Sequence, residues 1–570
     1  MESTEYIQDI LKCEGVQNAL NYTSVKMSID NILYVEKKAS LTNTQEIQEI
    51  KEIIEGKKEE EITSKWSTIM YIIGGIGGGD EGKGAIADNL LNILKTKLVD
   101  HIYTIWCIGT NGGSNAGHSV KCDNGKSYHV HFLNTGALHD FIKCFYGNTK
   151  VLEPMSLYKE LLDIVNTTYP MNELSEFDVT ILKRQELVDS ILKRSFFSDC
   201  IHVTTIGHLI KDRGEASSSI GTTGKGIGTT YATACSRTGI RLHDIVYKTM
   251  DELKIMLDKL YRDMGFKKPT DTEQEIEIFK YSDFLKFDDF RDIKKDENFI
   301  SITNRTLWDF TFDLRNFKWL KTILTEHIVH PGFFKQNVFN STCRVLVFEL
   351  ANAFLLDNTF GTYPNVTSSN CTASNIYEAT GLNITDMSLL KENNIEIIGV
   401  AKSYITRVGT GKLITDMRSS TDPEGSAIVD TLIETAGEFG VTTGRKRRPG
   451  WFDLVLVKYS MYINGYKSIN LTRLDNLNIT DTIKICIAYQ DKNGDILDYR
   501  NYPTDENLLD NYTPIYLQLK GWKNKTFDHI TSFDQFPDEV KIFINVISTA
   551  LKAPVKYINT GGRRGNLLIH

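Results

Sequence analysis

The chain has 570 residues, of which 41% are hydrophobic and 24% charged, and these proportions exclude a disordered, collagenous or membrane-embedded protein. Its 65 Lys and Arg residues against 73 Asp and Glu residues leave a net charge of -8, so the chain as a whole does not attract nucleic acid or anionic lipid. A local group of residues must therefore hold any anionic ligand.

The nine cysteines are widely spaced and include no CxxC pair, which favours a reducing compartment. The N-terminal sequence MESTEYIQDILK lacks the basic and apolar regions of a secretory signal, and no apolar run is long enough to span a bilayer. We therefore expect a cytoplasmic protein with no membrane or nucleic-acid partner.

Residues 1–65 are predicted to form an N-terminal extension. Isoleucines recur at helical spacing between Ile47 and Ile54, behind a possible cap at Asn43, and a charged linker follows at 57–61. This pattern predicts an amphipathic helix. We expect the extension to dock on the surface, and a regulatory or partner-binding role is the alternative.

The short apolar run 69–73 ends at glycines and predicts a buried strand, and the apolar stripe over 86–94 predicts the helix after it. Later apolar runs could add core strands at 344–348, 395–400 and 451–456. We therefore expect an α/β fold with a large, mostly parallel central β-sheet flanked by helices. The charged segment 267–299 is predicted to be a surface insertion.

The string GGGDEGKG at 77–84 fits the glycine and lysine positions of a P-loop. Backbone N–H groups and the helix N-terminus can surround a phosphate there, and Lys83 adds a charge. Gly84, however, stands where a nucleotide triphosphatase needs a hydroxyl for Mg²⁺. A carboxylate in such a loop is unfavourable unless it ligates a cation or acts as a base, which makes Asp80 the candidate. The alternative is a tight turn with a surface salt bridge between Asp80 and Lys83.

The second unusual string is NGGSNAGHS at 111–119. Its glycines allow close backbone approach, and the amide of Asn115 can both donate and accept hydrogen bonds. Taken alone, His118 would be a core or loop histidine. Beside a phosphate loop with a candidate base it becomes a candidate general acid.

Eight motifs in this order resemble the adenylosuccinate synthetase family, GTP-dependent ligases that join IMP and L-aspartate. They are GDEGKG (79–84), NAGH (115–118), GTTGKGIG (221–228), GTYPNVTSSN (361–370), TRVG (406–409), EFGVTTGRKRRPGW (438–451), LTRLDNL (471–477) and INTGG (558–562). The resemblance covers the chain from about residue 69 onward, and residues 66–570 are therefore expected to form the catalytic domain.

The resemblance implies a 6-phosphoryl-IMP intermediate and roles for three catalytic residues. Asp80 would take the proton from N1 of IMP, His118 would donate to the phosphates, and Lys83 would act in the phosphate loop. Mg²⁺ would be the cofactor, held by the carboxylate of Asp80 and the carbonyl of Gly117.

The resemblance also implies the substrate contacts. IMP would meet Asn115, Thr223, Arg237, Asn352, Thr367 and Arg445, with Arg237 supplied across the interface of a homodimer. L-aspartate would meet Val441, Thr442, Thr443, Gly444, Arg445 and Arg447. GTP would meet Gly79, Glu81, Gly82, Lys83, Gly84, Arg447, Arg473, Asp475, Asn559, Thr560 and Gly561. The carboxylate of Asp475 can accept N1–H and N2–H of guanine, which favours GTP over ATP.

Several positions depart from the family pattern. Gly77 and Gly78 replace Gln and Trp, and Arg473 replaces Lys. Asn352 replaces a glutamine that contacts the purine and is one methylene shorter. Two alternatives therefore remain: a 2-aminoadenylosuccinate synthetase that acts on dGMP, as in related viral enzymes, or a non-catalytic nucleotide-binding homologue. Those viral relatives commonly carry serine in place of Asp80, so its presence here favours IMP.

Overall fold

The structure is a computed structural model. It describes residues 2–13, 15–16, 21, 26, 68–98, 104–122, 125–170, 177–214, 222–267, 308, 310–341, 344–390, 394–407, 409–419, 421–440, 445–561 and 563–570.

The described chain alternates between strands and helices. The strands are β1 (Thr68–Gly75), β2 (Thr104–Gly112), β3 (His118–Lys121), β4 (Ser127–Val130), β5 (Lys143–Leu152), β6 (Ser195–Ser198), β7 (His202–Val203), β8 (Ile328–Val329), β9 (Arg344–Glu349), β10 (Ile395–Lys402), β11 (Ile405–Arg407), β12 (Arg448–Gly450), β13 (Phe452–Asp453), β14 (Ser468–Thr472), β15 (Thr482–Asp491), β16 (Tyr512–Lys520), β17 (Val555–Asn559) and β18 (Leu567–Ile569). The α-helices are α1 (Glu2–Lys12), α4 (Lys83–Leu98), α5 (Pro154–Thr168), α6 (Phe177–Lys193), α7 (Ile206–Asp212), α9 (Ile227–Cys235), α10 (Leu242–Tyr247), α11 (Met250–Asp263), α13 (Thr311–Leu324), α14 (Asn375–Thr380), α15 (Ile384–Ser388), α16 (Pro423–Ala436), α17 (Leu454–Asn464) and α18 (Asp538–Leu551).

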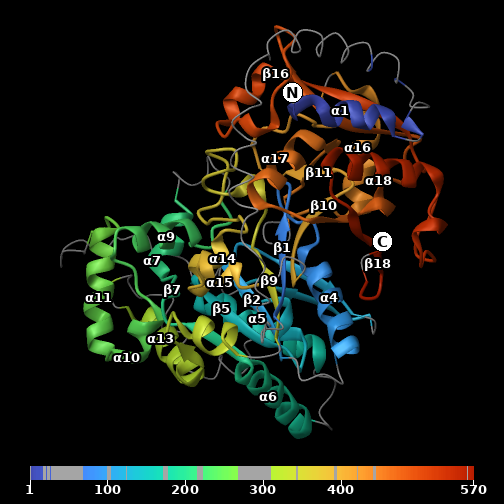
Figure 1. Cartoon of the computed structure of the whole chain (residues 1–570). Helices are drawn as coiled ribbons and strands as arrows, with labels where there is room; N and C mark the ends of the chain where they lie inside the picture. Colours follow the sequence, from blue (N-terminus) through green and yellow to red (C-terminus); the bar gives the residue numbers. More distant parts are fainter. Residues whose placement is uncertain are drawn as a thin grey trace, which may run out of the picture.

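A large sheet forms the centre of the molecule, in the order β18-β17-β14-β10-β1-β9-β2-β5-β6-β8, with β7 paired to β5 (Figure 1). Every pair along this path is parallel except β17 with β18. This confirms the predicted α/β fold with a mostly parallel sheet flanked by helices. β1 lies between β9 and β10, so the loop after it emerges at the middle of the carboxyl edge of the sheet.

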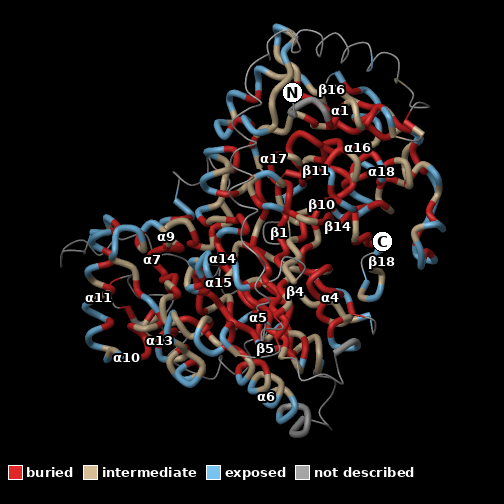
Figure 2. The backbone as a smooth tube through the Cα atoms, viewed as in Figure 1, coloured by how far each residue is buried: buried red, intermediate tan, exposed pale blue. Residues whose placement is uncertain are grey.

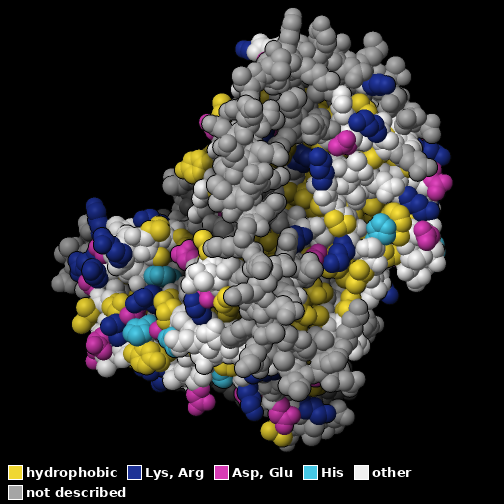
Figure 3. All heavy atoms as spheres, in the orientation of Figure 1, with side chains coloured by type: hydrophobic (Ala, Val, Ile, Leu, Met, Phe, Trp, Pro, Cys, Tyr) yellow, Lys and Arg dark blue, Asp and Glu magenta, His cyan; other side chains and the backbone are white. Residues whose placement is uncertain are grey.

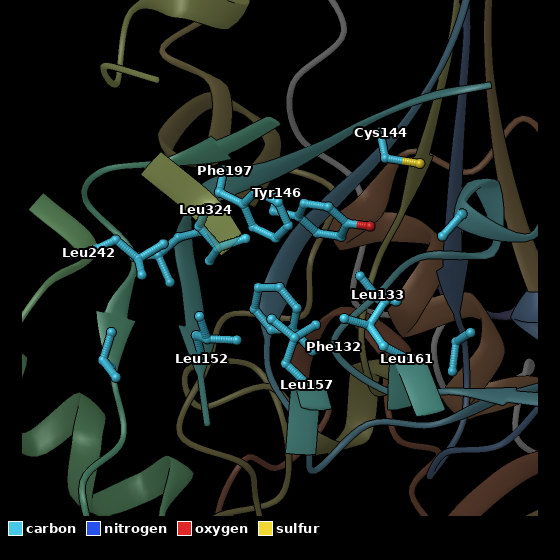
Figure 4. Packing of buried hydrophobic residues seen from close by; sticks show 14 of the residues in the cluster. Phe132, Leu133, Cys144, Tyr146, Leu152, Leu157, Leu161, Phe197, Leu242 and Leu324 are labelled. Atoms are coloured by element: carbon cyan, nitrogen blue, oxygen red, sulfur yellow. The ribbon is translucent and has the colours of Figure 1, made fainter. Parts of the chain in front are cut away.

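Side chains alternate between the two faces of the sheet, and helices cover both. Ile73 of β1 packs with Ile86 and Leu90 of α4, whereas Ile72 packs with Phe348 on the opposite face. The buried residues follow the central strands in Figure 2. On β5, Tyr146 stacks against Phe132 and Phe197, with ring centroids 5.2 and 4.6 Å away, and the rings of Phe132 and Phe197 also stack on each other at 6.2 Å (Figure 4). The three rings form part of the core on one face of the sheet.

The strands predicted at 69–73, 344–348 and 395–400 and the helix predicted over 86–94 are confirmed as β1, β9, β10 and α4. The strand predicted at 451–456 is wrong beyond Asp453, because a helix begins at Leu454. Asp453 caps that helix by accepting a hydrogen bond from the Leu456 backbone N–H at 3.1 Å. A short apolar run by itself does not distinguish a buried strand from a buried helix. Here the capping carboxylate of Asp453 favours the helix.

The predicted helix at 43–54 and the charged linker lie outside the described residues, as does the predicted insertion apart from Lys267. The described start of the extension is α1, which lies beside α18 in Figure 1. Its apolar face (Tyr6, Ile7, Ile10 and Leu11) is buried in the core formed with the C-terminal part of the chain.

Polar contacts also hold this N-terminal segment. Tyr6 Oη donates to the carbonyl of Ile487 at 2.6 Å. Asn21 pairs with the outer edge of β16, donating to the carbonyl of Tyr516 at 2.7 Å and accepting from the N–H of Gln518 at 2.8 Å. Because β16 is the last strand of the small sheet β13-β15-β16, these bonds satisfy backbone groups on an exposed edge.

Within the described ranges, no helix combines the length and apolar character that crossing a bilayer requires. Side chains of both charge signs are interspersed over the described surface visible in Figure 3.

We predict that α1 contributes directly to stability. Ile10→Ala removes a fully buried side chain and should lower the free energy of unfolding by about 3 kcal/mol. Lys12→Ala, on the exposed face of the same helix, should change it by less than about 0.5 kcal/mol. Chemical denaturation measures both, and equal effects of the two substitutions would contradict the burial of α1.

Candidate active site

The phosphate loop connects β1 to α4 and takes left-handed backbone conformations at Gly79, Asp80 and Gly82, with φ of 114, 61 and 100°. For Asp80 this conformation is unfavourable, and such strain concentrates at functional sites. The Glu81 carboxylate folds under the loop and accepts from the Gly79 N–H at 2.7 Å. Buried Lys83 lies 3.7 Å from the same carboxylate. Lys83 therefore pairs with Glu81, and the alternative of a surface salt bridge with Asp80 is wrong.

Asp80 instead forms a close ion pair with Arg447, which arrives from the segment before β12. The Arg447 guanidinium also donates to Glu438 Oε2 at 2.7 Å. Glu438 in turn accepts from Lys402 Nζ at 2.8 Å and from Tyr404 Oη at 2.6 Å. Since Asp80 is 35% exposed and Arg447 only 4%, this network links a solvent-accessible carboxylate to buried charges.

The buried carboxylate of this network, Glu438, is ionised. Burial alone would raise the pKa of Glu438, but the charges of Lys402 and Arg447 and the hydrogen bonds from Lys402 and Tyr404 lower it to about 2. Burial lowers the pKa of Lys402, and Glu438 opposes that effect. The network therefore holds a fixed cation, the guanidinium of Arg447, against Asp80.

His118 begins β3 and lies against the first turn of α4. Its Nδ1 forms a close ion pair with Glu349 Oε1, and Glu349 Oε2 accepts from the N–H and the hydroxyl of Thr135, both at 3.0 Å. Burial would raise the pKa of Glu349, but His118 and Thr135 lower it. Because Glu349 occupies Nδ1, Nε2 is the imidazole nitrogen that can exchange a proton with a substrate.

The contact between His118 and α4 explains the missing P-loop hydroxyl. A Cβ at Gly84 would lie 2.6 Å from the Cβ of His118, closer than real Cβ atoms approach. Serine or threonine therefore does not fit at this position while His118 stays in place.

The motifs expected to bind IMP meet beside the phosphate loop. Asn115 Nδ2 donates to the Thr367 hydroxyl at 3.1 Å. A Cβ at Gly228, in the motif that includes Thr223, would lie 3.0 Å from the Ser368 hydroxyl. Asn352 has a φ of 58°, and its buried Nδ2 has no hydrogen-bond partner among the described residues.

Two arginines expected to bind IMP lie at exposed positions. Arg237 follows α9 with a φ of 65° and is exposed, and Arg445 is exposed as well. The aspartate loop 441–444 lies outside the described residues. Gly117 immediately precedes His118 and is half-buried.

Two of the residues expected to bind GTP, Asp475 and Gly561, have Asp528 as a neighbour. Burial raises the pKa of Asp475, Arg473 opposes this, and the charge of Asp528 adds to it. A Cβ at Gly561 would lie 3.4 Å from Asp528 Oδ1. Asp475 and the turn that includes the buried Asn559 and Thr560 therefore lie around the same point.

Arg564 fixes this turn to the phosphate-loop helix. Its guanidinium donates to both carboxylate oxygens of Asp88 on α4, at 2.6 and 2.8 Å. Its backbone N–H donates to the carbonyl of Lys121 at 2.8 Å, at the end of the strand that His118 begins. The turn expected to bind guanine, the phosphate loop and the candidate acid His118 are thus held in a fixed arrangement.

Sequence reasoning missed Glu349, Lys402, Glu438 and Arg564. Glu349 and Lys402 are charged residues at the carboxyl ends of β9 and β10, and a ligand site is expected at the carboxyl edge of a parallel sheet. Their position at that edge could therefore have identified Glu349 and Lys402 as site candidates. Glu438 opens a family motif without an assigned role, and no local pattern marks Arg564.

The expected ligands, Asp80 and the Gly117 carbonyl, suit Mg²⁺, the cation that the family resemblance implies. No group of three or more His, Cys, Asp or Glu side chains with metal-binding geometry occurs among the described residues. Mg²⁺ does not need one, because it keeps several waters and usually takes one or two carboxylates plus substrate phosphates. Asp80 already faces a cation, Arg447, and remains accessible to solvent, so Asp80 and the Gly117 carbonyl are suitable ligands.

The fold and this site define a nucleotide-binding α/β enzyme whose phosphate loop includes a carboxylate. A family model described as adenylosuccinate synthetase matches residues 72–568. The adenylosuccinate synthetase of Yarrowia lipolytica is 32% identical over 490 residues, which span 86% of this chain and 96% of that protein. That of Plasmodium vivax is 31% identical over 492 residues, spanning 86% and 94%. The structure of fully ligated adenylosuccinate synthetase from Plasmodium falciparum is similar, with a TM-score of 0.67, 29% identity, and coverage of 88% of this chain and 99% of that one. The chain belongs to the adenylosuccinate synthetase family.

Stability should depend on Glu438 in a pH-dependent way. Glu438→Gln leaves Lys402 and Arg447 without their shared carboxylate and should cost about 3 kcal/mol near neutral pH. Because the folded pKa of Glu438 is below its ordinary value of 4.5, its contribution is complete above that value and is lost as the pH falls toward 2. The difference between variant and wild type should therefore shrink in acid.

Urea titrations across this pH range test the prediction. Glu434→Gln is the matched control, since Glu434 pairs with Lys446 at 3.0 Å on the exposed surface and should contribute less than about 1 kcal/mol. A constant difference between wild type and Glu438→Gln at every pH would contradict the ionised network.

Proposed function

We propose that this protein is a GTP-dependent ligase that joins IMP and L-aspartate to form adenylosuccinate, GDP and phosphate. Membership of the adenylosuccinate synthetase family makes it a ligase of purine biosynthesis. The observation that supports the detailed mechanism is the accessible carboxylate of Asp80 inside a phosphate loop, compensated by a guanidinium and flanked by a histidine–carboxylate pair.

In the first step Asp80 accepts the proton from N1 of IMP, which makes O6 nucleophilic. O6 then attacks the γ-phosphorus of GTP, so that the O6–P bond forms, the bond to the β,γ-bridging oxygen breaks and GDP leaves. Lys83 and the α4 N-terminus stabilise the charge on the phosphates, and His118 donates a proton to them. The Glu349 carboxylate holds the imidazole in position for this transfer.

In the second step the amine of L-aspartate attacks C6 and phosphate leaves. Residues 441–445 would hold the two carboxylates of aspartate, and arginine forks suit that task. Arg447, which pairs with Asp80 here, would exchange that contact for aspartate and the ribose of GTP. Its release leaves Asp80 free to act on IMP.

The remaining contacts follow the family resemblance. Asn115, Thr223, Asn352, Thr367 and Arg445 would bind IMP. Asp475 would select guanine, beside Arg473 and the turn Asn559, Thr560 and Gly561, while Gly79, Glu81, Gly82, Lys83 and Gly84 would hold the phosphates. Mg²⁺, held by Asp80 and Gly117, would supply charge neutralisation on the transferring phosphoryl group.

We further propose a cytoplasmic homodimer in which Arg237 of each subunit reaches the IMP site of the other. The support is its geometry: Arg237 is exposed and stands in a strained left-handed conformation at the end of α9.

Asp80→Asn tests the role of the carboxylate. The amide cannot take the N1 proton, so kcat should fall at least about a hundredfold while the affinity for GTP stays nearly constant. Release of labelled phosphate from GTP in the presence of IMP and aspartate measures kcat, and calorimetry measures the affinity for GTP. Asp140→Asn, at an exposed position, should leave both unchanged. Undiminished turnover in Asp80→Asn would contradict the mechanism.

A substrate comparison tests the choice of IMP. Steady-state rates with IMP or dGMP, each with GTP or ATP and with aspartate, should be highest for IMP with GTP, because Asp80 is present and Asp475 matches guanine. Faster turnover of dGMP with ATP would instead assign the protein to 2-aminoadenylosuccinate synthesis. No turnover of either would support a non-catalytic homologue.

A further inference from the structure

A carboxylate outside all eight motifs reaches the loop that includes Thr367. Glu506 begins the short 3₁₀ helix η12 (Glu506–Asn511), which precedes β16. Its Oε1 accepts from Asn365 Nδ2 at 2.6 Å, and its Oε2 accepts from the backbone N–H of Lys412 at 3.1 Å. One side chain thus joins two loops that lie 141 and 94 residues away from it in the sequence.

The backbone around Glu506 also docks on the first of these loops. The N–H of Tyr363 donates to the carbonyl of Thr504 at 2.7 Å, and the N–H of Glu506 donates to the carbonyl of Tyr363 at 3.3 Å. The segment before η12 therefore runs alongside the 361–370 loop, and the position of Glu506 is defined by its main chain as well as by its carboxylate.

The third member of this arrangement is the buried guanidinium of Arg407, which is only 1% exposed. It donates to the carbonyl of Asn365 at 3.1 Å and to the carbonyl of Lys412 at 3.2 Å. Glu506 Oε2 lies 4.0 Å from it. Since burying a cation without a compensating charge is costly, the nearby negative charge of Glu506 favours Arg407 in this position, together with the two carbonyl acceptors.

Arg407 connects this cluster to the phosphate loop. It ends β11, and its backbone forms a bridge with Gly78. A Cβ at Gly78 would lie 2.6 Å from the Thr406 carbonyl oxygen, so the two backbones are in direct contact. Asn365, at the other end of the cluster, is two residues from Thr367, which pairs with Asn115. The cluster therefore spans from the phosphate loop to the expected IMP loop.

We propose that Glu506 is a positioning residue that, through Arg407 and Asn365, holds the IMP-binding loop at a fixed place relative to the phosphate loop of GTP. This inference rests on the proposed function. Glu506 touches no substrate, and its effect is on the affinity of the Thr367 loop for IMP. A charge in η12 thereby sets the alignment of the two substrates.

Glu506→Gln tests this directly, because it keeps the size of the side chain and removes its charge. The KM for IMP and the dissociation constant of IMP from calorimetry should each rise about tenfold, which corresponds to about 1.4 kcal/mol. The KM for GTP should change less than about twofold, because the phosphates of GTP are held by Gly79–Gly84.

Asp510→Asn is the matched control on the same 3₁₀ helix. Asp510 pairs with Lys412 Nζ at 2.9 Å, but both side chains are exposed, so this substitution should leave the KM for IMP unchanged. Asn365→Ala removes the amide that donates to Glu506, together with a longer, exposed hydrogen bond from the Thr410 hydroxyl at 3.5 Å. It should also raise the KM for IMP and remains informative if Glu506→Gln folds poorly.

A double-mutant cycle separates positioning from general stability. On an Arg407→Lys background, Glu506→Gln should raise the KM for IMP much less than it does in wild type. The reason is that Arg407, through which Glu506 acts, is already altered. An unchanged KM for IMP in Glu506→Gln, or equal increases for IMP and GTP with a lowered melting temperature, would overturn the proposal. If the wild type itself makes no adenylosuccinate, the proposed function fails instead.

Discussion

The structure depends on the compensation of one negative charge inside a loop built to bind anions. Asp80 would repel phosphates, and its left-handed backbone adds strain. Arg447 balances this charge in the present structure, and it is itself paired with Glu438, which also binds Lys402. Each member of this chain of charges would be unfavourable alone, and together they keep a carboxylate accessible to substrate beside Lys83 and the N-terminus of α4.

The parallel sheet is what gathers these charges. β9 and β10 flank β1, so their last residues, Glu349 and Lys402, emerge next to the phosphate loop. Glu349 then orients His118, and Lys402 supports Glu438. The acid candidate and the base candidate thus share one edge of the sheet but have separate charged partners, Glu349 for His118 and Arg447 for Asp80.

Segments far from the family motifs stabilise the C-terminal half of the molecule. The first helix, α1, adds four buried apolar side chains to the core around α18. Asn21 closes the edge of β16, and Glu506, just before that strand, fixes Asn365 and Lys412. These contacts come from parts of the chain outside the recognisable motifs.

Local patterns were enough to predict the order of strand, phosphate loop and helix and to single out Asp80, Lys83 and His118. Glycine spacing and apolar periodicity act over a few residues, and the structure follows them in β1, α4, β9 and β10. The run at 451–456 misled the prediction, because its length and composition suit a strand and a buried helix equally.

Only tertiary structure decided that Arg447 pairs with Asp80, Glu349 with His118, and Glu506 with Asn365 and Arg407. Such pairs join residues about a hundred or more positions apart, and their free energy comes from shared burial, which no local spacing encodes.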